Sequence, residues 1–189
     1  MNSRRKTADA LAGLSRRVPE GMDLLMAISG AENERDRSEA LVRGALVEDA
    51  LQRAILNRMR ALDAPDGRRL FGPNAPLSSF YGQIAVAYAI KIIGPRTRDD
   101  LDCIREIRNA FAHTISRIEF TTPEVAAHCA HSQLPARFPP GWGPHDLPWP
   151  PTASEPRRLF LATTNLLWTY LMDAARETRT LPDEAYFLI

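Results

Sequence analysis

Apolar residues recur at spacings of three and four residues along most of the chain, which is the period of helices that bury one face. No alternating run of β-branched residues is long enough to indicate a strand. The clearest apolar stripe consists of Leu101, Ile104, Ile107, Phe111, Ile115 and Ile118. The pattern predicts an all-α protein, a single-domain helical bundle of about six or seven helices with a Pro-rich loop before the last helix.

The expected helices are mostly bounded by proline or glycine. Their approximate ranges are 7–17, 20–29, 34–62, 78–93, 97–118, 123–132 and 155–178. Segment 63–76 holds three prolines and two glycines and is expected to be a loop. Thr97 and Asp100 fit a capping box at the start of the helix that carries the apolar stripe.

The chain divides into four stretches of one domain. They are an N-terminal helical segment (1–30), a helical core (31–132), a Pro/Trp-rich loop (133–153), and a C-terminal helix and tail (154–189) packed as part of the same domain. The loop contains Phe138, Trp142 and Trp149, whereas disordered linkers are usually poor in aromatic residues. We therefore expect the loop to pack on the helical body or, alternatively, to cover a partner or a site.

The charge balance narrows the function classes. The chain has 24 Lys+Arg against 23 Asp+Glu, for a formal net charge of +1, so it is not a strongly basic nucleic-acid-binding domain. Two cysteines, Cys103 and Cys129, fit reduced thiols, and no apolar run approaches the roughly 20 residues of a membrane span. We expect a cytoplasmic protein with no membrane partner.

Common catalytic and cofactor motifs are absent from the sequence. It has no Gly-rich phosphate loop, no GxSxG, no HExxH and no CxxC, and we expect no cofactor. His128, Cys129 and His131 form a tight cluster, but their spacing matches no common zinc pattern. We expect no metal there, and interpret the segment as a surface helix with one buried thiol.

Three residues near the end of the striped helix are the best candidates for chemistry: Arg108, Asn109 and His113. At 100° per residue, Asn109 and His113 project opposite the apolar stripe, whereas Arg108 falls at its edge. Arg108 and His113 are thus about 140° apart on a regular helix. They would converge on one phosphate only if the helix ended or distorted at His113, or if two chains packed these helices together.

A structural role for Arg108 is an alternative. Arg37 and Glu48 project onto the apolar face of the 34–62 helix, and a buried charge is costly unless it is paired. We therefore expect a structural ion pair among Arg37, Glu48, Asp49 and Arg108. His113 would then be a surface histidine near a helix C-terminus, where the helix dipole favours the imidazolium.

Several short segments resemble the mannitol operon repressor (MtlR) family. They are ERDRSEALV (34–42), LVEDAL (46–51), GP (72–73), PLSSF (76–80), AYAI (87–90) and IREIRNAFAH (104–113). The resemblance extends over about residues 30–125, and the Pro-rich stretch with its following helix also resembles that family. It implies an all-helical, self-associating cytoplasmic protein that is named a transcriptional repressor. The sequence shows no helix-turn-helix with a basic recognition helix.

The segment from Arg108 to His113 also resembles the signature of HEPN domains, helical bundles in which such residues lie at the mouth of a dimer cleft. In active members, RNA cleavage is metal-independent. The resemblance implies that His113 acts as general acid or base, that Arg108 stabilises charge on the phosphate, and that Asn109 orients one of them. Acidic residues crowd the same helix, however: Asp99, Asp100, Asp102 and Glu106.

The expected function is that of an MtlR-like bacterial regulatory protein, a homodimer that acts through protein contact in transcription control without a DNA-binding motif of its own. The alternative is a HEPN-type metal-independent endoribonuclease that uses Arg108, Asn109 and His113 across a dimer cleft, with RNA as its partner. A third reading is a structural bundle in which Arg108 is a brace.

Overall fold

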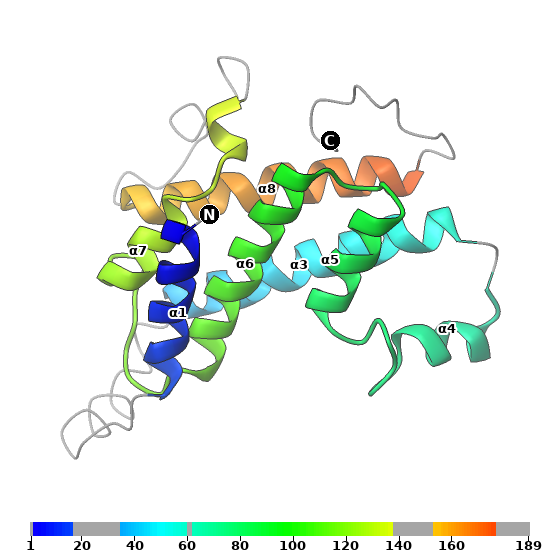
Figure 1. Ribbon diagram of the computed structural model, residues 1–189, viewed down its shortest axis with the longest axis horizontal. Helices are drawn as coiled ribbons and strands as arrows, with labels where there is room; N and C mark the ends of the chain where they lie inside the picture. The colour runs from blue at the N-terminus through cyan, green and yellow to red at the C-terminus, as the bar shows by residue number, and fades with distance from the viewer. Residues whose placement is uncertain (1, 17–34, 60–61, 138–152, 177–189) are drawn as a thin grey trace.

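Seven α-helices and one 3-10 turn make up the part of the chain that the computed structural model describes, namely residues 2–16, 35–59, 62–137 and 153–176 (Figure 1). No strand occurs in these residues. The prediction of an all-α helical bundle is therefore confirmed. Among the described helices, none combines the length and apolar character needed to cross a membrane.

The helices occur in the expected order along the chain. They are α1 (Asn2–Arg16), α3 (Arg35–Arg58), α4 (Ala64–Phe71), α5 (Phe80–Ala89), α6 (Pro95–His113), α7 (Pro123–Cys129) and α8 (Glu155–Arg176), with the 3-10 turn η2 (Leu134–Arg137) before α8. The helix expected over 20–29 lies outside the described residues. So do Phe138, Trp142 and Trp149 of the Pro/Trp-rich loop.

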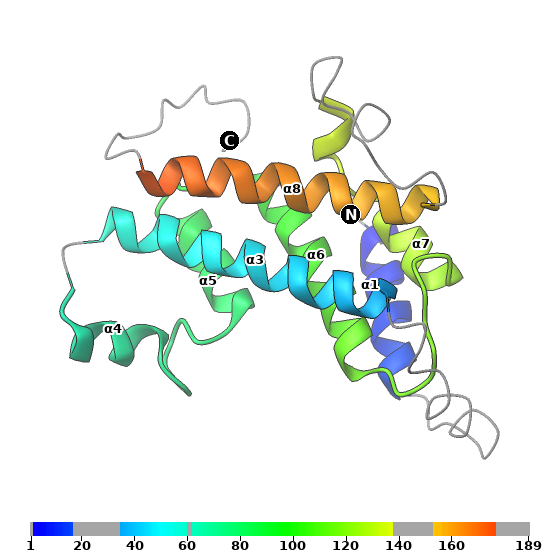
Figure 2. The same cartoon turned by 180° about the vertical axis from the view of Figure 1, so that it is seen from behind.

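Helices α3 and α8 lie side by side and run in the same direction (Figure 2). Near their N-termini, the guanidinium of Arg157 lies 2.7 Å from the carboxylate of Glu39. Near their C-termini, the side chain of Asn57 donates a hydrogen bond of 3.2 Å to the carbonyl of Ala174. These two contacts fix the register of a helix pair whose members are far apart in sequence.

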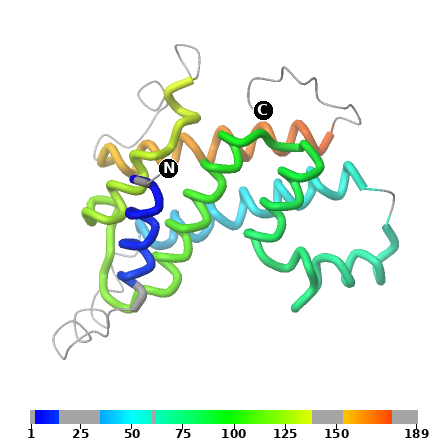
Figure 3. Tube along the Cα trace, viewed as in Figure 1, coloured from blue at the N-terminus to red at the C-terminus, as the bar shows by residue number. Residues whose placement is uncertain are grey.

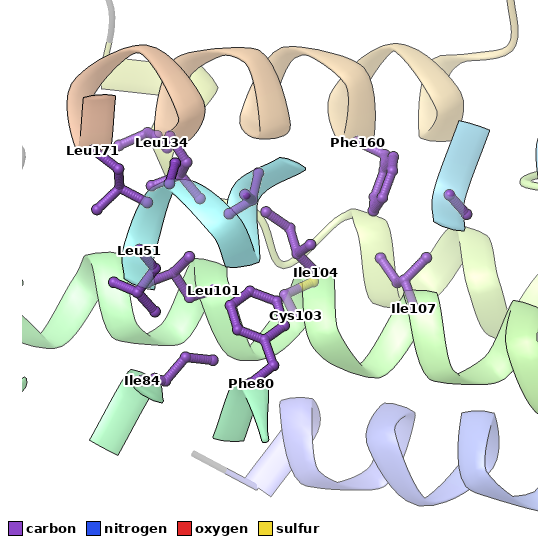
Figure 4. Packing of buried hydrophobic residues seen from close by; sticks show 14 of the residues in the cluster. Leu51, Phe80, Ile84, Leu101, Cys103, Ile104, Ile107, Leu134, Phe160 and Leu171 are labelled. Carbon is purple, nitrogen blue, oxygen red and sulfur yellow. The ribbon is translucent and has the colours of Figure 1, made fainter. Parts of the chain in front are cut away.

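The hydrophobic core lies around α6, which contacts α1, α3, α5, α7 and α8. Its stripe is buried at Leu101, Ile104, Ile107 and Phe111. Figure 4 shows the first three of these packed among other core residues. The core continues beyond this helix because the ring of Phe120 lies 5.1 Å from the rings of both Phe111 and Phe160, measured between centroids. Burial of this contiguous apolar surface is the main favourable term in forming the bundle.

The ends of α6 differ from the expectation. Gly94 is the N-cap and Pro95 begins the helix, so the expected capping box of Thr97 and Asp100 is wrong. Proline suits this position because its missing N–H would have no partner in a first helical turn. At the other end, Thr114 takes an extended conformation. The helical period stops there, and Ile115, expected on the buried stripe, is 56% exposed.

The segment expected to be a loop contains α4. Asp63 caps this helix by accepting a hydrogen bond from the backbone N–H of Asp66, and Pro65 lies in its first turn. Proline is compatible with the first turn of a helix. The expectation of a loop is wrong here because it treated Pro65 as a residue that interrupts helices. None of the residues of α4 is buried. The trace in Figure 3 shows α4 at the edge of the bundle, away from α1 and α7.

Candidate functional site

Arg108 packs between α6 and α3. Its guanidinium lies 3.1 Å from the carboxylate of Glu48. Its aliphatic stem lies along Gly44, where an added Cβ would come within 3.0 to 3.2 Å of three Arg108 carbons. Burial raises the pKa of Glu48, and the charge of Arg108 opposes that rise. The pair therefore braces two helices at a point where only glycine leaves full room for the arginine.

The other two members of the expected ion pair lie elsewhere. Arg37 donates a hydrogen bond of 2.9 Å to the backbone carbonyl of Thr114, just after the end of α6. Asp49 pairs with Arg53 at 2.7 Å on the exposed side of α3. The structure thus brings Arg108 and Glu48 together, but neither Arg37 nor Asp49 joins them.

His113 and Asn109 lie apart from the Arg108 contact. His113 is the last residue of α6 and is exposed, whereas Asn109 is half-buried one turn earlier. The helix stays regular up to its C-cap, so Arg108 faces α3 while His113 projects about 140° away. The three residues of the HEPN-like signature do not converge within one chain.

A buried polar cluster at the junction of α1, α6 and α7 was missed by the sequence analysis. His128 is fully buried, with Nε2 2.8 Å from a carboxylate oxygen of Glu106 and Nδ1 3.0 Å from the hydroxyl oxygen of Thr7. The expected buried thiol is confirmed in Cys129, but the interpretation of the rest of this segment as a surface helix is wrong, because His128 is buried as well. Helix α7 has only seven residues, too few for a period to reveal its buried face.

Arg4 joins the same cluster from α1. Its guanidinium lies 2.9 Å from Asp99 and 3.9 Å from both Asp102 and Glu106. Burial acts to raise the pKa of Glu106, but the hydrogen bond and charge of His128, with Arg105 and Arg4, outweigh it and hold the pKa below its ordinary value. The cluster fixes α1 on the bundle, and α1 accordingly begins at Asn2 rather than at residue 7.

The described residues contain no group of three or more His, Cys, Asp or Glu arranged to hold a metal ion. The rings of His128 and His131 meet edge to face, with centroids 6.0 Å apart. Because Glu106 and Thr7 already occupy both nitrogens of His128, that imidazole has no lone pair directed at an open site.

A second surface missed by the sequence analysis lies on α5 and α6, and we call it the tyrosine–arginine face. The guanidinium of Arg98 lies 4.3 Å from the ring centroid of Tyr88, and that of Arg105 lies 5.5 Å from that of Tyr81. Both distances are those of cation–π contacts. Tyr81 is 64% exposed, so the face presents aromatic surface to solvent. The spacing of seven residues between the two tyrosines places them on one side of a helix, and this is the sequence feature that could have indicated the face.

No protein-family model, curated protein or solved structure matches this chain. The resemblance to mannitol operon repressors and the resemblance to HEPN domains therefore rest on the short sequence segments alone. Two features of the structure bear on function: the positions of Arg108, Asn109 and His113, and the exposed tyrosine–arginine face.

Proposed function

We propose that the protein is a regulatory protein of the mannitol operon repressor type that acts by protein contact and has no nuclease centre. The observation that carries the proposal is the placement of Arg108 against Gly44 and Glu48. A nuclease needs this guanidinium to hold a phosphate. Moving it toward one would leave the carboxylate of Glu48 partly buried and without its cation, which is costly.

The tyrosine–arginine face is the contact surface in this proposal. Tyr and Arg are enriched among the residues that dominate binding energy at protein interfaces. Arg105 is already paired with Glu106 at 2.9 Å and with Asp102 at 3.3 Å. The positive charge that this face offers a partner therefore comes from Arg98, which forms no ion pair with a carboxylate of the described residues, and from the exposed Lys91 and Arg96 beside it. This charge favours a partner that presents an acidic segment with apolar side chains.

One experiment tests the absence of a nuclease centre. The full chain is incubated with single-stranded RNA in EDTA, beside Arg108→Ala and His113→Ala variants whose helicity is verified by circular dichroism. The proposal expects no cleavage above buffer by any of the three. Cleavage by the wild type that both substitutions abolish without loss of helicity would establish the endoribonuclease instead.

A second experiment tests the contact surface. The probes are a fluorescent peptide of alternating Glu and Leu residues and fluorescent single- and double-stranded DNA, followed by anisotropy. The proposal expects the peptide to bind and Arg98→Glu to weaken that binding by about tenfold, a change of about 1.4 kcal/mol. The matched control is Arg69→Glu on α4, an exposed arginine outside this face. Preferential binding of DNA, or no binding of the peptide, would reject the acidic partner.

A further inference from the structure

A hollow of about 220 Å³ opens between α3 and α8, and we call it the α3–α8 hollow. Its lining consists of Arg43, Leu46, Thr164, Asn165 and Trp168. Leu46 is 48% exposed and Trp168 is 43% exposed, so two large apolar side chains of the lining are open to solvent. Pockets that hold drug-sized ligands measure roughly 300–1,000 Å³. The α3–α8 hollow is smaller, and its size suits a molecule built on a single ring.

Arg43 is the charged residue of this lining, and its side chain is half-buried. No carboxylate of the described residues forms an ion pair with it, because Glu39, one turn earlier on α3, is bound to Arg157 at 2.7 Å. Burial lowers the pKa of Arg43, and the charge of Arg157 acts in the same direction against the charge of Glu39. A partly buried cation without its own anion is costly. An anion that entered the hollow would remove this cost.

The polar groups of the lining offer hydrogen-bond donors to a ligand. The hydroxyl of Thr164 donates within α8, to the backbone carbonyls of Phe160 and Leu161 at 2.9 and 3.0 Å. The side-chain oxygen of Asn165 accepts a hydrogen bond from Arg43, which leaves the amide NH₂ group of Asn165 with two donors. Arg43 keeps further donors, because a guanidinium carries five N–H groups. The ligand must therefore supply acceptors, a negative charge and an apolar surface.

We propose that the α3–α8 hollow binds a small aromatic carboxylate. The carboxylate accepts hydrogen bonds from the guanidinium of Arg43, whose planar fork matches the geometry of two carboxylate oxygens. The ring of the ligand packs against the indole of Trp168 and the side chain of Leu46. An inorganic anion would leave this apolar surface in water, and a neutral aromatic molecule would leave Arg43 without an anion. The carboxylate and the ring are both required.

The ligand would contact both helices of the α3–α8 pair. Arg43 and Leu46 belong to α3, and Asn165 and Trp168 belong to α8. A molecule that binds this pair only in the folded chain stabilises the fold. Figure 2 shows α3 and α8 in front of α5 and α6, the helices that carry the tyrosine–arginine face. The two surfaces share no residue, so this proposal stands or falls independently of the proposed function.

An NMR titration of the full chain with phenylacetate tests the site. The readout is the indole N–H signal of Trp168, identified by its absence from the spectrum of Trp168→Phe. The expected result is a saturable shift with a dissociation constant below about 1 mM. Phenylacetamide has the same ring without the charge and should bind at least about tenfold more weakly. Equal binding of the acid and the amide, or no shift with phenylacetate at about 10 mM, overturns the proposal.

A matched pair of substitutions on α3 tests the role of Arg43. Arg43→Gln removes the charge but keeps an amide that can donate to Asn165, and it should raise the dissociation constant of phenylacetate by about tenfold. The control is Arg53→Gln, which removes an exposed arginine of the same helix that is paired with Asp49, and it should change the constant by less than about twofold. Circular dichroism verifies the helicity of both variants. Unchanged binding by folded Arg43→Gln overturns the site.

Two further titrations distinguish other occupants of the hollow. Inorganic phosphate tests a general anion site, and the peptide of alternating Glu and Leu residues tests a protein contact. Neither should shift the Trp168 signal at the concentration at which phenylacetate saturates it. A matching shift with phosphate would show that the ring is not needed, and a matching shift with the peptide would make the hollow part of a protein interface. Either result overturns the assignment to a small aromatic carboxylate.

Discussion

The imidazole Nε2 of His128 lies 2.8 Å from a carboxylate oxygen of Glu106, although the histidine is fully buried. Its other ring nitrogen lies 3.0 Å from the hydroxyl oxygen of Thr7. One side chain of α7 thereby ties α6 and α1 together through polar contacts inside an otherwise apolar region. Removal of the imidazole would leave Glu106 and Thr7 facing a cavity.

His128→Ala should therefore lower the free energy of unfolding by about 3 kcal/mol, from the loss of a buried polar partner and the cavity left behind. Urea denaturation followed by circular dichroism measures this change. His131→Ala is the control, since its ring is only half-buried, and should cost less than about 1 kcal/mol. Equal losses for the two variants would show that the buried contacts of His128 contribute nothing.

Arg108→Ala should lower the free energy of unfolding by about 2 kcal/mol at pH 7, because it leaves Glu48 without its cation. Burial already raises the pKa of Glu48, and loss of Arg108 raises it further. A carboxyl group whose pKa is raised on folding loses its contribution to stability as the pH rises. The deficit of the variant should thus be smaller near pH 4 than at pH 7.

A double-mutant cycle isolates this pair. Glu48→Gln combined with Arg108→Ala should cost less than the sum of the two single substitutions, because neither partner is then left as an unpaired charge. Urea titrations at pH 7 give the coupling. Strict additivity would mean that the 3.1 Å contact contributes no coupling energy.

Asp100 should make the protein less stable as the pH rises from about 4 to about 7. Its carboxylate accepts hydrogen bonds from the backbone N–H groups of Gln133 and Leu134, at 2.8 and 3.0 Å. Burial nevertheless outweighs these bonds and raises its pKa from 3.8 to about 6. The contribution of protonated Asp100 to the free energy of unfolding is fully present below pH 3.8 and is lost as the pH rises through about 6.

Asp100→Asn removes this titration. Relative to the variant, the wild type should lose roughly 2 kcal/mol between pH 4 and pH 7. The amide can replace one of the two accepted hydrogen bonds, so a constant offset accompanies the pH-dependent part. Urea denaturation of both proteins across this range measures the difference, and parallel stability curves would contradict the raised pKa.

The two cysteines should react slowly in the folded protein. Both are buried, and burial raises the pKa of Cys103 to about 12 and that of Cys129 well above its ordinary value. Since the thiolate is the nucleophile, reaction with an aromatic disulfide reagent at pH 8 should be roughly 100-fold slower than in urea. Two thiols that react at the unfolded rate would contradict this burial.

The sequence predicts the fold where one helix buries a long stripe. Leu101, Ile104, Ile107 and Phe111 repeat often enough for the period of α6 to show its buried face. The same reasoning fails at Ile115, because periodicity carries no information on where the backbone leaves the helical conformation. That break depends on Thr114, whose carbonyl accepts a hydrogen bond from distant Arg37.

The candidate site could be predicted only in part. The projection of Glu48 onto the buried face of its helix indicates a need for a cation, and Arg108 supplies it. No local pattern indicates that Arg37 bonds a backbone carbonyl instead. The burial of His128 could not be predicted for a related reason. Its partners Thr7 and Glu106 lie on other helices, and the sequence around His128 gives no indication that these helices pack against it.

The pairing of α3 with α8 has a consequence for folding during translation. The contact between Glu39 and Arg157 spans 118 residues of sequence. A ribosome therefore completes α3, α5, α6 and α7 before it releases the helix that covers α3. Until then the apolar side chains of α3 that pack against α8 remain exposed to solvent in the nascent chain, and the packing of the bundle is completed only after translation of α8. Ribosome stalling ahead of α8 should leave a chain that chaperones retain.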